Sequence, residues 1–111
     1  MPTVDKSKWQ AATDLLSRQI HGQPARLEVA SLKLGDQVEA EWTPLLGVTY
    51  DPKDDLFEIR LEGLDHLVTH PRQFAIHERA GLADSLMVVD GEGIEHILQL
   101  RQPIALPPTP A

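Results

Sequence analysis

The hydrophobic period changes once along this 111-residue chain, and that change limits the folds it can adopt. Between residues 5 and 20, apolar side chains recur every three or four positions, which predicts one amphipathic helix. The residues on this stripe are Trp9, Ala12, Leu15, Leu16 and Ile20. Asp5 or Ser7 can cap its start, and Gly22 followed by Pro24 is typical of a helix end.

From residue 25 onward the period becomes two, which is typical of strands with one buried and one solvated face. The alternation predicts that Val38, Ala40 and Trp42 share a buried face. Less regular runs at 74–77 and 86–89 precede a last strand at 94–100. The apolar residues of the other clear runs are Leu27, Val29, Phe57, Ile59 and Leu61.

Turn residues separate these runs and indicate an antiparallel meander. Gly35-Asp36, Asp51-Pro52-Lys53-Asp54 and Asp90-Gly91-Glu92-Gly93 all have turn chemistry, and Thr43-Pro44 predicts a bulge or an edge. The expected fold is therefore α+β. An N-terminal helix packs on a five- to six-stranded antiparallel meander, which can curl into a partial barrel.

We expect one domain over residues 1–106, followed by a Pro-rich flexible tail at 107–111. The net charge of −7 and the scattered Lys and Arg residues argue against binding to nucleic acid or to an anionic membrane. The chain has no cysteine, no signal-peptide core at its start and no run of about 18 apolar residues. These features predict a cytoplasmic protein.

Several short segments carry a resemblance to known sequences. They are Trp9, Leu16–Arg18, Gly22, Leu27–Val29, Gly47–Asp55, Leu64–Leu67, His70-Pro71, Val89-Asp90 and Leu100–Pro103. On these segments, nearly the whole chain resembles a family of short bacterial proteins catalogued as a domain of unknown function. The resemblance implies a bacterial, single-domain protein, and it brings no activity, cofactor or catalytic residue.

The histidines are the best functional candidates in the sequence. If 65–70 is a strand, His66 and His70 share a face but lie about 13 Å apart, too far to chelate one ion. On a helix they would be neighbours, yet zinc would still need a third ligand. We favour surface or turn histidines over a metal site, with a pH-responsive contact as the third reading. His96 lies between Ile94 and Leu98, which predicts a structural histidine bonded to a carbonyl or a carboxylate.

Other chemistry has little support. Asp51, Asp54 and Asp55 do not match a calcium loop, because Leu56 stands where that loop needs glycine. No Gly-x-Ser-x-Gly elbow is present, and Gly91-Glu92-Gly93 is too short to cradle a phosphate. The sequence predicts no catalytic residue, no metal ligand and no cofactor.

Two classes of function remain. The one we favour is a non-catalytic accessory or protein-interaction domain, whose partner is another protein or a second copy. A homodimer would form through a strand edge or an apolar sheet patch. The strands at 86–89 and 94–100 are the expected edges, and Met87 or Val89 is expected in the buried patch. The alternative is a binder of a small ligand or metal, with a pocket at the mouth of the sheet that could support weak catalysis.

Overall fold

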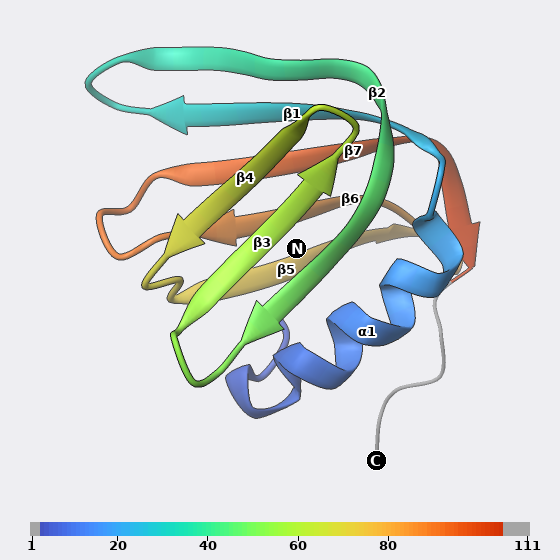
Figure 1. The fold of residues 1–111 in the computed structure, drawn as a ribbon, viewed down its shortest axis with the longest axis horizontal. Helices are drawn as coiled ribbons and strands as arrows, with labels where there is room; N and C mark the ends of the chain where they lie inside the picture. The colour runs from blue at the N-terminus through green and yellow to red at the C-terminus, as the bar shows by residue number, and fades with distance from the viewer. Residues whose placement is uncertain (1–2, 106–111) are drawn as a thin grey trace.

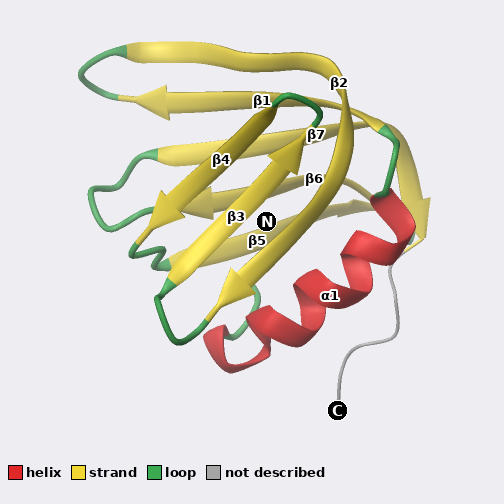
Figure 2. Ribbon diagram, in the orientation of Figure 1, coloured by secondary structure: helices red, strands yellow, loops and turns green. Residues whose placement is uncertain are grey.

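The N-terminal helix is present and packs on a seven-stranded antiparallel sheet. The computed structural model describes residues 3–105 and is drawn in Figures 1 and 2. A single turn of 3-10 helix, η1, precedes the one α-helix. In chain order the elements are η1 (Lys6–Lys8), α1 (Trp9–Ile20), β1 (Pro24–Ser31), β2 (Gly35–Asp51), β3 (Leu56–Leu61), β4 (Leu64–Thr69), β5 (Gln73–Arg79), β6 (Leu82–Val89) and β7 (Glu95–Ala105).

The strand count and the strand order both differ from the expectation. The order is β4-β3-β2-β1-β7-β6-β5, so two meanders are joined where β1 pairs with β7. The additional strand is β4, whose core-facing side includes His66 between Leu64 and Val68 and so lacks a clean apolar pattern. Among the described strands β4 and β5 stay at opposite ends of the order, so the sheet is not closed into a barrel.

The long strand β2 bends and carries the chain from one half of the sheet to the other. Its first half pairs with β1 and its second half pairs with β3. Three register shifts interrupt these ladders, two against β1 and one against β3. Because a bulge bends a strand, β3 and β4 fold over the other strands, as Figure 1 shows. The bulge predicted near Thr43-Pro44 is confirmed.

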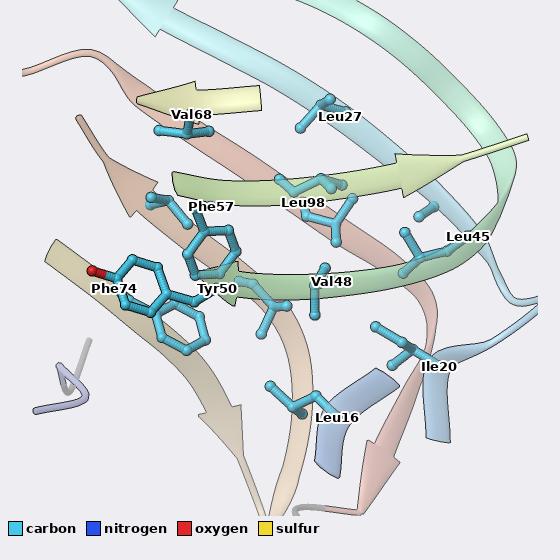
Figure 3. Close-up of a cluster of buried hydrophobic side chains, with 14 of the residues drawn as sticks. Leu16, Ile20, Leu27, Leu45, Val48, Tyr50, Phe57, Val68, Phe74 and Leu98 are labelled. Carbon is cyan, nitrogen blue, oxygen red and sulfur yellow. The ribbon is translucent and has the colours of Figure 1, made fainter. Parts of the chain in front are cut away.

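The core lies between these two halves, and α1 covers one side of it. Trp9, the first helical residue, is buried with its ring edge-on to three aromatic rings. Ring centroids lie 5.1 Å away for Tyr50, 6.4 Å for Phe57 and 6.1 Å for Phe74. Figure 3 shows the side chains of Leu16 and Ile20 facing those of Leu45 and Val48 in the second half of β2.

The ends of α1 follow the sequence closely. The Asp5 carboxylate accepts the backbone N–H of Ser7 at 3.0 Å and caps η1, which leads into α1. Gly22 has φ +82°, the left-handed conformation that glycine adopts without a steric cost. Asp5 therefore caps the helical segment at η1, as expected, and Gly22 ends it, whereas α1 itself begins after Lys8, which makes no side-chain cap bond.

The expected burial of the first half of β2 is wrong. Val38 is 46% exposed and Trp42 is 36% exposed. A register shift lies between the pairs Leu27↔Ala40 and Glu28↔Val38, which places two β2 residues against one of β1. Val38 therefore leaves the face that Ala40 shares with Leu27 and joins the outer face with Glu28.

The expected dimer edges are also wrong, because β6 and β7 lie inside the sheet. β7 pairs with β1 and β6, and β6 pairs with β7 and β5. At the end of the sheet, Thr3 forms a β-bridge with Ala75 and lies along β5. The predicted tail at 107–111 lies outside the described residues.

Candidate functional site

Two histidines and one aspartate form a chain of hydrogen bonds across the two halves of the sheet. His96 on β7 is 7% exposed, and its Nε2 lies 3.0 Å from Oδ2 of Asp90. Its Nδ1 lies 2.9 Å from Nε2 of His66 on β4. His96 is therefore the hydrogen-bonded structural histidine that the sequence predicted, with a carboxylate as its partner.

The hydrogen bonds fix where the protons of this chain lie. Burial raises the pKa of Asp90, but bonds from His96 and from the backbone N–H groups of Ile94 and Glu92 outweigh it and lower the pKa overall. The charged Asp90 accepts a hydrogen bond from His96 Nε2–H, and in that neutral tautomer His96 Nδ1 accepts a hydrogen bond from His66 Nε2–H. His66 Nδ1 then carries a free lone pair.

This arrangement disfavours a charge on His66. Burial lowers the pKa of His66 below 6.5, the nearby His96 lowers it further, and Glu39 acts in the opposite direction. The folded chain thus binds the proton less readily than the unfolded chain. The contribution of neutral His66 to the free energy of unfolding is therefore fully present above about pH 6.5. It is lost as the pH falls through the lowered pKa of His66.

We therefore expect the free energy of unfolding to decrease between about pH 7 and pH 5, measured by urea denaturation. His66→Gln removes the titrating group and should flatten this part of the profile. The exposed His21 provides the control, and His21→Gln should leave the slope as it is. Identical slopes for the parent and His66→Gln would contradict the assignment.

The other histidines lie apart from this chain. β4 is a strand, so the first of the two cases considered for His66 and His70 applies. His70 follows the end of β4, with its Nδ1 3.7 Å from Oδ2 of Asp55. His77 pairs with Asp84 at 2.7 Å on β5 and β6. Within residues 3–105, no group of three or more His, Asp or Glu side chains is placed to hold a metal ion.

The acidic turn is a structural anchor. The carboxylate of Asp55 accepts the hydroxyl of Tyr50 at 2.6 Å and pairs with Nζ of Lys6 at 3.0 Å. These two contacts lower the pKa of Asp55, while burial and Asp55 together raise the pKa of Tyr50 to about 12. Lys6 also donates to the carbonyl of Pro71. The turn therefore ties the start of the chain to the sheet.

A hollow of about 370 Å³ lies between the β1–β2 turn and the β6–β7 turn. None of its lining residues belongs to the chain of His66, His96 and Asp90, so the hydrogen-bonded histidines do not face the hollow. The lining residues are Ser31, Leu32, Lys33, Glu92, Gly93 and Ile94.

Exposed apolar side chains gather on the hairpin of β1 and β2. We call residues 30–43 the arm; they include the end of β1, a turn and the first half of β2, at the top of Figure 1. Seven large hydrophobic side chains of the described residues are exposed, and four of them belong to the arm. Those four are Leu32, Leu34, Val38 and Trp42, and Leu46 follows just after the arm.

One edge of the arm is the unpaired side of strand β2. Residues 35–44 of β2 pair with β1 on one side, and β3 begins to pair only at Leu45. Within residues 3–105, no other strand pairs with the opposite side of β2 between 36 and 42. Backbone N–H and C=O groups along such an edge can accept an added strand.

Trp42 has an unusual backbone at the end of this edge. Its φ is +51°, which is uncommon for an aromatic residue, and the Arg101 guanidinium lies 5.5 Å from its ring centroid. Backbone strain held by the surrounding structure often marks a functional position. The sequence contains one sign of this surface, since Leu32 and Leu34 lie within a turn, where polar residues are usual.

The strain at Trp42 can be measured with two substitutions. Trp42→Gly and Trp42→Ala both remove the side chain, but only glycine relieves the positive φ. We expect the glycine variant to be more stable by about 1 kcal/mol in chemical denaturation. Equal stability, or a more stable alanine variant, would show that the position is not strained.

Together, the fold and the exposed arm define an α+β domain with one helix on an antiparallel sheet and an uncovered strand edge. The chain belongs to the Family of unknown function (DUF5335), whose model matches residues 1–109. It is also 43% identical over 105 residues to an uncharacterized protein from Aquifex aeolicus (strain VF5), covering 94% of this chain and 95% of that protein.

No solved structure matches this chain. Among the described residues, the helix is too short and too polar to cross a membrane. The family and the bacterial relative assign no reaction, so the function has to be argued from the surface.

Proposed function

We propose that this protein is a non-catalytic interaction domain that accepts an extended segment of another protein along the free edge of β2. The observation that carries the proposal is the unpaired edge at 36–42 together with the exposed Val38 and Trp42. An added strand would gain backbone hydrogen bonds from the edge and side-chain contacts from both residues. A cytoplasmic setting fits a chain without cysteine.

The alternative, a ligand pocket at the mouth of the sheet, has weaker support. A ligand site needs a concave surface with convergent polar groups. Here the hollow is lined by two turns, while the histidine chain lies elsewhere. The arm instead combines apolar exposure with an open strand edge in one place, which is typical of strand addition.

Site-specific photo-crosslinking in native cells tests the proposal. A photoreactive residue at Val38 should form an adduct with one discrete protein. The same residue at Leu67 or Leu82, which are as exposed as Val38 but lie outside the arm, should not. The crosslinked segment of the partner, made as a peptide, should then bind the purified protein. Adducts of equal yield at all three positions would contradict a site on the arm.

A further inference from the structure

The free edge is acidic along its length. Every charged side chain between Gly35 and Thr43 is a carboxylate, and all of these side chains are exposed: Asp36, Glu39 and Glu41. In the described part of the chain, no Lys or Arg forms an ion pair with any of them. The edge therefore presents backbone groups, apolar side chains and unneutralised negative charge together.

The outer face also carries a fourth carboxylate, Glu28, whose own charge is balanced by Arg26. Glu28 on β1 lies beside Asp36, and hydrogen bonding and repulsion from Glu28 raise the pKa of the Asp36 carboxyl. The nearby Arg26 is already used, since its guanidinium binds Glu28 at 2.6 Å. Asp36 has no Lys or Arg partner among the described residues, so a cation from outside the chain would relieve the repulsion between the two carboxylates.

The same charges oppose pairing with a second copy. Two copies related by a two-fold axis at Ala40 would place Glu39 of one opposite Glu41 of the other. An axis at Glu39 would place the two copies of Glu39 together. Like charges directly opposite in an antiparallel pair are destabilising, and the net charge of −7 adds long-range repulsion.

We infer that the segment received by the edge of β2 is a basic strand that carries Lys or Arg together with apolar residues. This inference rests on the function proposed above and names the partner's chemistry. Asp36 and Val38 lie two residues apart on the outer face, where they favour a basic and an apolar neighbour on the added strand. Glu39 and Glu41 extend the same preference toward the bulge.

Three synthetic peptides of about six residues, the usual strand length, test the charge preference by calorimetry. All three peptides carry Val and Thr at the same fixed positions. The variable positions are all Lys in the first peptide, all Gln in the second and all Glu in the third. We expect the Lys peptide to bind about tenfold more tightly than the Gln peptide, and the Glu peptide to bind least. Raising the salt concentration should weaken the Lys peptide selectively.

A charge-reversed protein provides the reciprocal test. The triple variant Asp36→Lys, Glu39→Lys, Glu41→Lys should prefer the Glu peptide. Its matched control, Asp14→Lys, Glu62→Lys, Glu78→Lys, changes the net charge equally at exposed sites outside the arm and should keep the original order. If the arm variant does not fold, the charge preference is tested by the salt dependence of Lys-peptide binding to the unchanged protein.

The outcomes separate the two levels of the argument. Equal binding of the Lys and Gln peptides, without salt dependence, would contradict the inference that the partner strand is basic. It would still agree with the proposal that the edge of β2 is the binding site. A loss of the preference in the control variant would show that net charge, and not the arm, selects the peptide. Binding of none of the three would count against the edge itself.

Discussion

Removing residues 1–22 is expected to abolish cooperative unfolding. The deletion takes away α1, which covers one side of the core, and bares the apolar face of β2 around Leu45 and Val48. It also removes the bridge between Thr3 and Ala75, so the edge of β5 is exposed as well. Exposed apolar surface next to an open strand edge favours aggregation.

Thermal melting followed by circular dichroism, together with light scattering, measures this effect. The full chain should melt in one sharp transition, and the truncated chain should show a broad transition or precipitate. Adding a peptide of residues 1–22 to the truncated chain should recover part of the transition, because the missing surface is supplied again. If the truncated chain melts as sharply as the full chain and at the same temperature, the helix does not contribute to the core.

Trp9→Ala is expected to cost about 3–5 kcal/mol, the usual range for deleting a buried aromatic side chain. Trp9 is 1% exposed and contacts the rings of Tyr50, Phe57 and Phe74, which belong to three different strands. Its indole N–H also donates to the carbonyl of Val4 at 2.8 Å. The substitution leaves a cavity where the helix meets the two halves of the sheet, and the loss is a large share of a typical domain stability.

The second tryptophan is the matched control. Trp42 is 36% exposed on the arm, so Trp42→Ala should cost about 1 kcal/mol or less in the same urea titration. The comparison separates the loss of a tryptophan as such from the loss of the core contact. Similar costs for the two variants would contradict the central position of Trp9.

The sequence predicted those parts of the fold that local chemistry decides. The helical stripe from Trp9 to Ile20 and the left-handed Gly22 depend on neighbouring residues, and both are present. Strand order depends on contacts between distant segments, which alternation does not encode. That is why the pairing of β1 with β7 was not foreseen and why β6 and β7 were expected at an edge.

The candidate surface was the hardest feature to predict. Alternation predicted a buried face for Val38 and Trp42, since it counts residues and takes no account of a bulge. His96 was predicted correctly as a structural residue because its apolar neighbours are local. Its contacts with His66 and Asp90 join separate strands and a turn, so only the folded chain shows them.

Hydrogen exchange of the backbone amides tests the central claim, that the edge of β2 is the binding site, most directly. The protein is measured alone and with a saturating amount of the basic peptide. We predict slower exchange on binding for those amides of residues 36–42 that point away from β1, because an added strand would supply them with hydrogen-bond partners. Unchanged exchange at 36–42, with protection appearing instead along the other open edge at β4, would contradict the account.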